Sequence, residues 1–399
     1  MEVSYDIITI KDRFFAGFST IYGVQADFNQ GIRMFRDIKI DSYRGLREAT
    51  LEDLDRVNVV IGENNSGKTS VLEAIQILGQ DNVLDNLVSV DKARYSSNRM
   101  RMGSSPSKYD SLLYSFPTGS SKIRIAANWN GRDVEAEVSS HTEYLNRYDL
   151  SFTRDGMDAV QYYLSDDGHV PAFAGDYSYY MQGYGELHQD FIIPAVGLLK
   201  DDEPVNLSKK DRREPPINIR YISPRDLYLG TYEIGFFKGL SMEDKEQLVR
   251  LLRIFDPSIV NVESSLVGFT KRILIENESG SIKPISVYGE GMRRAFSIAN
   301  ALRATRGGAL LIDEFEVGIH KNALVSFVEF LCVSAKENDT QLFLTTHSGD
   351  AIDALIDVHK QGNGFNSYRL ESFKNDIYVR QYAGKDLYSL RQEQGYGLL

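Results

Sequence analysis

The chain has 399 residues, 42% of them hydrophobic, and a formal net charge of −11. This length predicts one large domain or two to three lobes, and the acidic balance excludes a protein that binds polyanions over its whole surface. The single cysteine, Cys332, excludes an internal disulfide, and no apolar run is long enough to cross a bilayer. We therefore expect a cytoplasmic protein without membrane contact, in which any nucleic-acid contact would use a local basic patch.

Residues 1–31 are predicted to form an N-terminal extension with weak strand signals. Residues 32–140 are the first part of the predicted main domain, and alternating apolar residues between Met34 and Ile40 indicate strands at its start. Within this part, Asn130-Gly131 lies between two alternating apolar runs and predicts a tight hairpin turn. The pattern favours an antiparallel β subdomain near the N-terminus.

The stretch from Gly62 to Thr69 spells a complete G-x-x-x-x-G-K-T phosphate loop. The apolar run 57–61 before it predicts a strand, and apolar residues at helical spacing follow it. In this setting, backbone N–H groups of the loop and of the helix N-terminus can cradle phosphate oxygens. Lys68 can reach the outer phosphates, and the Thr69 hydroxyl is a predicted Mg²⁺ ligand.

Residues 141–216 have a different composition, which predicts an insertion that contacts a partner or another copy of the chain. A charged, proline-ended stretch closes it at residues 200–216. Tyrosines crowd into it, namely Tyr144, Tyr148, Tyr162, Tyr163, Tyr177, Tyr179, Tyr180 and Tyr184. Tyrosine suits recognition surfaces because one end is apolar and the other forms hydrogen bonds. The alternative is that these tyrosines pack the segment against the core.

After residue 217 the second part of the main domain, 217–399, contains an apolar strand that ends in two carboxylates, Asp313 and Glu314. The run from Gly308 is apolar on both faces, as in a parallel sheet. Asp313 is the predicted Mg²⁺ ligand, and Glu314 is the predicted general base for the attacking water. The alternative is that the aspartate only caps a helix.

The segment from Gln341 to Thr346 predicts another apolar strand, which ends at His347. A histidine at this position can form a hydrogen bond with the γ-phosphate. The alternative is an ordinary polar residue with protein partners. The order of phosphate loop, acidic strand and histidine strand favours the functional interpretation.

The segment from Ser286 to Arg294 contains two glycines and opens a predicted helix. Small residues at a helix start present N–H groups to phosphate. Because the chain already has its own phosphate loop, we expect this segment to cap the nucleotide of a second subunit. Arg293 and Arg294 are then expected to stabilise charge across that interface. The alternative is a glycine turn before a surface helix.

Four motifs together resemble those of ABC-type ATPase heads. In chain order, Gly62–Thr69 resembles the Walker A motif and Ser286–Arg294 resembles the signature. Further along, Leu310–Glu314 resembles Walker B and Thr345–His347 resembles the H-loop. Glu316-x-Gly318-x-His320 looks like the D-loop. The spelling is most similar to the OLD/SMC/RecF-like branch (AAA_15/AAA_21-like), whose members are soluble ATPases of DNA repair and phage defence. This resemblance implies an α/β ABC-type head with a P-loop core sheet, an N-terminal antiparallel β subdomain and a helical, tyrosine-rich insertion.

The resemblance also implies residue roles. Lys68, Glu314 and His347 become catalytic, with Glu314 as general base and His347 as γ-phosphate sensor, while Thr69 and Asp313 hold Mg²⁺. The implied ATP contacts are Gly62, Glu63, Asn64, Asn65, Ser66, Gly67, Lys68, Thr69, Ser70, Ser286, Gly289, Glu290 and Gly291, with Arg44 near the base or ribose. The signature departs from L-S-G-G-Q, so the hydroxyl that reaches the γ-phosphate in trans stays open. No Q-loop glutamine can be placed.

No D-x-D pair follows His347, so a fused nuclease of the Toprim type is not expected. The chain resembles stand-alone ATPase subunits of phage-defence systems such as PARIS and Septu. This implies an ATPase that assembles head to head or into higher oligomers and controls a separate nuclease or toxin. Two alternatives stay open. One is a repair-type ATPase that acts on DNA ends through Arg99, Arg101 and residues 209–213. The other is a nucleotide-gated scaffold with vestigial turnover.

Overall fold

The computed structural model describes residues 33–80, 82–95, 108–151, 167–195, 198–199, 217–224, 241–267, 270–359, 364–373 and 376–394. The chain divides into two compact units, residues 1–32 and 33–399, and all described residues belong to the second. The predicted N-terminal extension and the basic clusters at Arg99, Arg101 and 209–213 lie outside the described residues. Within the described ranges, no helix combines the length and the apolar character needed to span a membrane.

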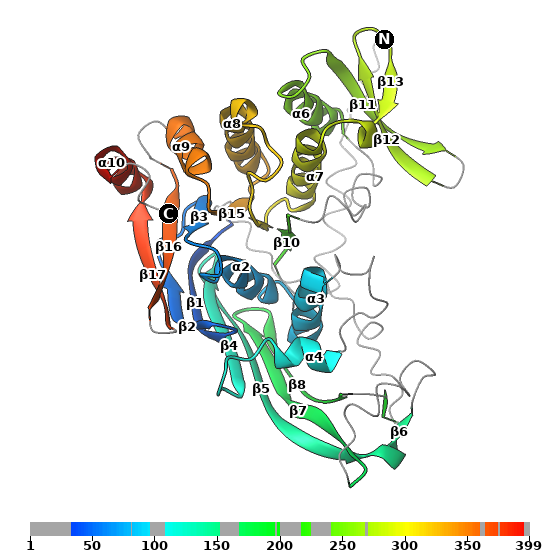
Figure 1. Cartoon of the computed structure of the whole chain (residues 1–399), viewed down its shortest axis with the longest axis vertical. Coiled ribbons are helices and arrows are strands. Elements are labelled where there is room, and N and C mark those ends of the chain that lie inside the picture. Colours follow the sequence, from blue (N-terminus) through cyan, green and yellow to red (C-terminus); the bar gives the residue numbers. More distant parts are fainter. Residues whose placement is uncertain are drawn as a thin grey trace, which may run out of the picture. The chain divides into compact units, whose positions relative to one another are not determined.

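A six-stranded sheet forms the centre of this unit (Figure 1). Its order is β10-β14-β15-β3-β16-β17, and only β17 runs antiparallel to its neighbour. The strands are β10 (Ile219–Ile222), β14 (Ala309–Ile312), β15 (Gln341–Thr346), β3 (Val57–Ile61), β16 (Asn366–Phe373) and β17 (Asp376–Ala383). Every residue of β3, β14 and β15 is buried, as expected for parallel strands covered on both faces. The three strands predicted around the motifs are therefore confirmed.

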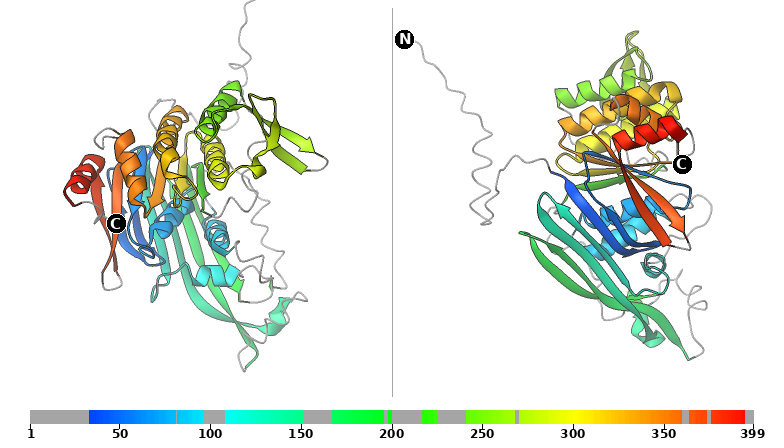
Figure 2. Two further views of the ribbon diagram at one scale, coloured as in Figure 1. Left: turned by 45° about the horizontal axis from the view of Figure 1, so that its top comes forward. Right: turned by 90° about the vertical axis from the view of Figure 1, so that its left-hand side faces the viewer.

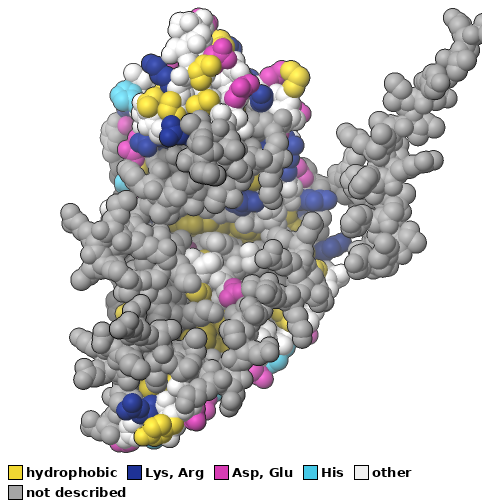
Figure 3. All heavy atoms as spheres, turned by 90° about the vertical axis from the view of Figure 1, so that its right-hand side faces the viewer, with side chains coloured by type: hydrophobic (Ala, Val, Ile, Leu, Met, Phe, Trp, Pro, Cys, Tyr) yellow, Lys and Arg dark blue, Asp and Glu magenta, His cyan; other side chains and the backbone are white. Residues whose placement is uncertain are grey.

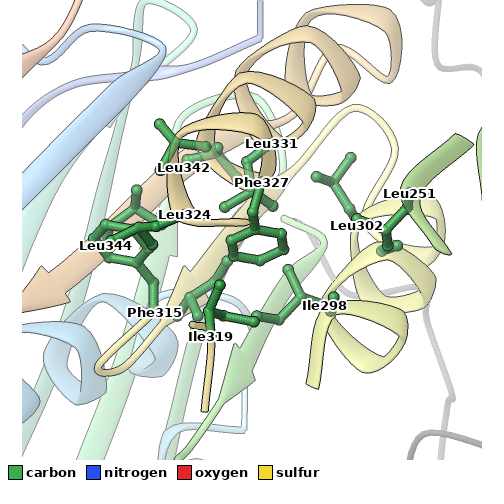
Figure 4. Close-up of a cluster of buried hydrophobic side chains, with 14 of the residues drawn as sticks. Leu251, Ile298, Leu302, Phe315, Ile319, Leu324, Phe327, Leu331, Leu342 and Leu344 are labelled. Carbon is green, nitrogen blue, oxygen red and sulfur yellow. The ribbon is translucent and has the colours of Figure 1, made fainter. Parts of the chain in front are cut away.

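Helices cover both faces of the core sheet (Figures 1 and 2). One face packs against α2 (Lys68–Ile77), and the other packs against α7 (Glu290–Ala304), α8 (Lys321–Glu337) and α9 (Gly349–Val358). Alternate residues of β14 divide between two cores: Leu310 and Ile312 pack toward α7–α9, whereas Ala309 and Leu311 pack toward α2. Figure 4 shows side chains from β15, α6, α7 and α8 meeting in the first of these cores.

A second six-stranded sheet is antiparallel throughout and packs against α2. In spatial order its strands are β2 (Leu46–Leu51), β1 (Phe35–Tyr43), β4 (Lys122–Trp129), β5 (Arg132–Asn146), β7 (His169–Met181) and β8 (Gly185–Pro194). The predicted turn at Asn130-Gly131 joins β4 to β5, and both residues have the positive φ that a type I′ turn needs. This sheet confirms the N-terminal antiparallel β subdomain. Two helices, α3 (Val83–Tyr95) and α4 (Lys108–Leu113), follow α2 in the chain.

One buried side chain, Gln341, ties the two sheets together. Its Nε2 donates hydrogen bonds to Phe35 O at 3.0 Å and to Asp55 O at 2.9 Å, and its Oε1 accepts one from Phe35 N–H at 2.8 Å. Gln341 begins β15 of the core sheet, whereas Phe35 begins β1 of the antiparallel sheet. The Phe35 ring also lies edge-on to Trp129, with centroids 4.6 Å apart. The antiparallel sheet is therefore pinned to the core sheet at this point.

The predicted insertion at residues 141–216 is not a separate element, and its starting boundary is wrong. Strand β5 runs through residue 141 without a break, and β7 and β8 extend the same antiparallel sheet. The described part of this range holds strands and one 3-10 turn, and the expected helical character of the range stays a prediction. Tyr177 and Tyr179 are buried in the core beside α2, whereas Tyr144 and Tyr148 are exposed. Both uses of tyrosine therefore occur, and the bias in composition came from long strands.

A three-stranded antiparallel sheet precedes α7 and packs beside α6 (Met242–Arg253). Its strands are β11 (Ile259–Val267), β12 (Thr270–Asn277) and β13 (Ile282–Pro284). Ser241 and Asp244 form a capping box at the start of α6. Figure 3 shows apolar and charged side chains intermingled at this end of the unit. The remaining elements are β6 (Leu150–Ser151), β9 (Leu198–Leu199) and α10 (Gly384–Gln394).

Candidate active site

The phosphate loop joins the carboxyl end of β3 to α2. Gly62 and Gly67 have φ angles of 147° and 97°, which residues with side chains rarely adopt. A Cβ on Gly62 would also lie 2.8 Å from both Leu370 O and Ser66 Oγ, so the turn leaves no space for a side chain. No side chain caps α2, and the N–H groups of its first turn therefore face the loop. Three loop residues are exposed, namely Glu63, Asn64 and Asn65.

Lys68 is folded back onto the loop. Its Nζ donates to Gly62 O and to Glu63 O, each at 2.7 Å, and the side chain is largely buried. Burial lowers the pKa of Lys68, although Asp313 and other nearby carboxylates act in the opposite direction. Ser66 Oγ is buried and finds no hydrogen-bond partner among the described residues. An anion held in the loop would supply acceptors to both groups, so these residues fit a bound triphosphate.

Asp313 follows β14 and receives three hydroxyl groups from three other elements. Its Oδ2 accepts from Thr69 Oγ1 of α2 at 2.9 Å and from Tyr221 OH of β10 at 3.1 Å. Its Oδ1 accepts from Thr345 Oγ1 of β15 at 2.5 Å. A carboxylate and a threonine hydroxyl in contact at the end of the phosphate loop are the hard oxygen donors that Mg²⁺ prefers. Thr69 and Asp313, the two predicted ligands, therefore lie together and fit the ion.

Glu314 and His347 also meet at the carboxyl edge of the core sheet. The distance between Glu314 Oε1 and His347 Nδ1 is 3.7 Å, and both side chains remain partly exposed to solvent. Glu314 has a φ of 47°, a left-handed conformation that few non-glycine residues adopt. Its N–H donates to Thr345 Oγ1 at 2.8 Å. The predicted general base and the predicted phosphate sensor are thus neighbours at an open edge of the site.

Glu316 adds a second carboxylate that sequence reasoning left without a role. Its Oε1 lies 4.0 Å from His347 Nδ1 and accepts a hydrogen bond from Thr346 Oγ1 at 2.5 Å. The Thr346 oxygen in turn accepts the Ser348 N–H at 2.9 Å. Burial raises the pKa of Glu316, whereas the Thr346 hydrogen bond lowers it. Tyr221 is the residue at this edge that the sequence did not single out. Glu316, Thr345 and Thr346 lie in the segments that resemble the D-loop and H-loop, but the sequence predicted no individual role for them.

The signature segment presents an exposed tip and a packed base. Ser286, Gly289 and Glu290 are exposed, and a Cβ on Gly289 would meet nothing within 4 Å. Gly291, in contrast, lies against the D-loop, where a Cβ would come within 2.5 Å of Gly318 O. The tip is therefore accessible to a second copy, and the second glycine serves the internal packing of its own chain.

Gly291→Ala is expected to lower the free energy of unfolding by about 1–3 kcal/mol, because the new methyl group overlaps a backbone carbonyl that cannot rotate away. Urea unfolding measures the change. Gly289→Ala is the matched control, since it makes the same substitution two residues earlier in open space. Equal stability of the two variants would contradict the packing role of Gly291.

Arg294 does not face a second subunit, so that expectation is wrong. Its side chain is fully buried, and its guanidinium donates to Ser223 O and, at 2.9 Å, to Asp313 O. Adjacent residues on a helix point about 100° apart, so the two arginines cannot serve the same surface. Arg293 is partly exposed, and its contact with a partner stays a prediction. Arg294 instead joins α7 to the ends of β10 and β14.

Arg44 lies in the tight turn between β1 and β2. Its Nε is 3.0 Å from Glu73 Oε2 and donates to Tyr43 OH at 3.0 Å, while its Nη1 donates to Tyr114 O at 3.1 Å. Glu73 is on α2, so this contact fixes the turn against the helix that follows the phosphate loop. A role for Arg44 at the base or ribose stays a prediction.

Two protein-family models match the chain. The one described as "AAA ATPase domain" (AAA_15) matches residues 34–140, which include the phosphate loop. The one described as "AAA domain, putative AbiEii toxin, Type IV TA system" (AAA_21) matches residues 175–354, which include Asp313, Glu314 and His347.

Individual proteins are similar over different shares of the chain. The "ATP/GTP phosphatase" of Helicobacter pylori is 22% identical over 382 residues, covering 89% of this chain and 97% of that protein. The uncharacterized protein MJECL11 of Methanocaldococcus jannaschii is 34% identical over 111 residues, covering 25% of this chain and 97% of its own. Among solved structures, an SMC head domain from Thermotoga maritima aligns with 87% of this chain and 98% of that one, at 11% identity and a TM-score of 0.42.

Proposed function

The chain belongs to the AAA-type ATPases of the AAA_15 and AAA_21 families, and from that premise we propose that two copies enclose Mg²⁺-ATP between them and hydrolyse it. Each site would combine the phosphate loop of one copy with the exposed signature tip of the other. The observation that carries this proposal is the meeting of Thr69, Asp313, Glu314 and His347 at one edge of the core sheet. The similar protein of Helicobacter pylori is an "ATP/GTP phosphatase", which supports hydrolysis.

The chain's own residues divide the chemistry. When ATP binds, Lys68 Nζ gives up its hydrogen bonds to the carbonyls of Gly62 and Glu63 and donates to phosphate oxygens instead. Mg²⁺, held by Thr69 and Asp313, would supply charge neutralisation for the phosphates. Glu314 accepts the proton of the attacking water.

His347 lies beside Glu314, with its Nδ1 3.7 Å from Glu314 Oε1. Its Nδ1 faces Glu314 and Glu316, so its second ring nitrogen is the one available to a phosphate oxygen. Loss of the γ-phosphate would then change the contacts of His347.

We further propose that this assembly controls a separate effector protein, a nuclease or toxin, in anti-phage defence. The family description that names a toxin of a type IV toxin–antitoxin system supports a paired partner. The exposed Tyr144 and Tyr148, at the far end of β5, are a suitable contact surface for it. Nucleotide must then favour one assembly over the other, and a roughly 10⁴-fold preference corresponds to about 5.5 kcal/mol.

Mixing two inactive variants tests whether the site is shared between copies. Lys68→Ala removes the phosphate contact, and Gly289→Asp places a charge on the signature tip, where the structure leaves space for it. Each alone is expected to lack phosphate release. An equimolar mixture is expected to recover about a quarter of wild-type activity, because half of the dimers are mixed and each has one intact site.

The outcome separates two readings of the same protein. If the wild-type protein is active but the mixture is as inactive as each variant alone, each copy hydrolyses ATP with its own residues. An inactive wild type would instead contradict the ATPase proposal itself. Pull-down of a co-expressed neighbouring gene product, with and without a non-hydrolysable ATP analogue, tests the effector proposal separately.

A further inference from the structure

Thr345 occupies the space between the two carboxylate residues that follow β14. It is fully buried near the end of β15, and β14 and β15 pair in parallel, with Ile312 opposite Leu344. Its hydroxyl oxygen lies 2.5 Å from Asp313 Oδ1 and 2.8 Å from Glu314 N. One atom, the Thr345 hydroxyl oxygen, therefore contacts both Asp313, the predicted metal ligand, and the backbone of Glu314, the predicted general base.

The direction of these two hydrogen bonds is fixed by chemistry. The Glu314 N–H can only donate, and the Asp313 carboxylate can only accept. The hydroxyl has one proton, so it must accept from Glu314 and donate to Asp313. Each bond polarises the next in such a chain, and the charged acceptor at its end strengthens both.

We call this chain of hydrogen bonds, from Glu314 N–H through the Thr345 hydroxyl to Asp313, the relay. Each end of the relay is a group whose orientation needs to be held. At one end, Asp313 has two oxygens with different partners, and the Thr345 bond to Oδ1 directs Oδ2 toward Thr69 and Tyr221. At the other end, Glu314 has the left-handed φ of 47°, which places its N–H toward β15. The same hydroxyl thus orients the carboxylate that would hold Mg²⁺ and the backbone that carries the general base.

We propose that Thr345 is a positioning residue for ATP hydrolysis, one that fixes Asp313 and Glu314 relative to each other through its hydroxyl. This inference rests on the proposed function of the site. Thr346, the next residue, points to the other side of the strand and makes a parallel relay from Ser348 N–H to Glu316. The consecutive threonines therefore serve different carboxylates, and only Thr345 reaches the pair at the metal site.

Thr345→Val removes the hydroxyl at almost constant shape and leaves Glu314 N–H and Asp313 Oδ1 without this partner. We expect kcat to fall about 100-fold, the usual effect of misplacing reacting groups by about 1 Å, with a smaller change in KM for ATP. The Mg²⁺ concentration that half-saturates hydrolysis should rise about tenfold, because a supporting contact of a metal ligand is lost. Thr345→Ser keeps the hydroxyl and is expected to restore most of both losses.

A second measurement uses the protein without nucleotide. Hydrogen exchange at the Glu314 amide, resolved by mass spectrometry with fragmentation, should become about tenfold faster in Thr345→Val. Thr340→Val is the matched control, because Thr340 is equally buried just before β15 and, among the described residues, its hydroxyl bonds to the backbone carbonyls Thr305 O and Asn338 O. That control should change neither the exchange nor the Mg²⁺ requirement.

The proposal is overturned if Thr345→Val matches Thr340→Val in kcat and Mg²⁺ requirement, or if Thr345→Ser is as impaired as the valine variant. Unchanged exchange at Glu314 would also overturn it, because the relay would then not hold that amide. Failure of the proposed function looks different. In that case wild type, Thr340→Val and both Thr345 variants would all lack hydrolysis, while the exchange difference at Glu314 would persist.

Discussion

Glu314→Gln is expected to slow ATP hydrolysis by about 10²- to 10⁴-fold while nucleotide binding persists. Glutamine keeps the size of the side chain but cannot take a proton from water. The backbone N–H of residue 314 still donates to Thr345, so the left-handed turn and the Asp313 carboxylate keep their positions. With hydrolysis blocked, ATP itself should drive assembly. Phosphate release and light scattering after size-exclusion chromatography in ATP measure the two effects.

The same substitution at Glu329, an exposed residue of α8, is the control for a general change in charge. It is expected to hydrolyse ATP at the wild-type rate and to assemble only with a non-hydrolysable analogue. If Glu314→Gln hydrolysed ATP normally, another group would have to be the base. If it were inactive but failed to assemble in ATP, the link between bound nucleotide and assembly would be contradicted.

Arg294→Met is expected to lower the free energy of unfolding by about 3 kcal/mol. The guanidinium is fully buried, and its removal leaves the carbonyl oxygens of Ser223 and Asp313 without the donors that it supplies. Each buried polar group that loses its partner costs about 1–3 kcal/mol. Methionine fills much of the volume of the arginine stem, so cavity formation adds little. The midpoint of urea unfolding at constant slope gives the change directly.

Arg293→Met is the matched control, one residue earlier on the same helix and partly exposed. It is expected to stay within about 0.5 kcal/mol of the wild type, as surface substitutions usually do. Similar losses in both variants would mean that the buried contacts of Arg294 contribute no more than general helix packing.

The chemistry of the site was predictable from the sequence because its motifs are local. The phosphate loop needs its strand, its glycines and its helix in one continuous stretch, and all three are readable from residues 57 to 78. Asp313 and His347 were predictable for a related reason. Both follow strands that are buried along their whole length, and the carboxyl ends of parallel strands share one edge of a sheet.

Other parts of the site depend on neighbours that no local pattern reveals. Thr345 and Tyr221 act on Asp313 only because β15 and β10 flank β14, and that strand order is a property of the whole fold. Arg294 and Arg293 are identical in type and adjacent in sequence, so only the packing of α7 decides which one is buried. The start of β5 was predicted from the hairpin at Asn130-Gly131, but its continuation past residue 140 and the strand β7 were missed because their tyrosine-rich composition suggested a surface segment rather than a sheet.

The contact between Gln341 and Phe35 fixes where the antiparallel sheet begins on the core sheet. Phe35 pairs with Trp129, and Trp129 pairs with Arg132 at the base of β5. From there β5 (Figure 1) runs for 15 residues, which corresponds to roughly 45–50 Å, and Tyr144 lies close to its last residue, Asn146. A change of only about 5° in the direction of β5 at its base would displace its far end by about 4 Å, which is enough to make or break a contact between side chains.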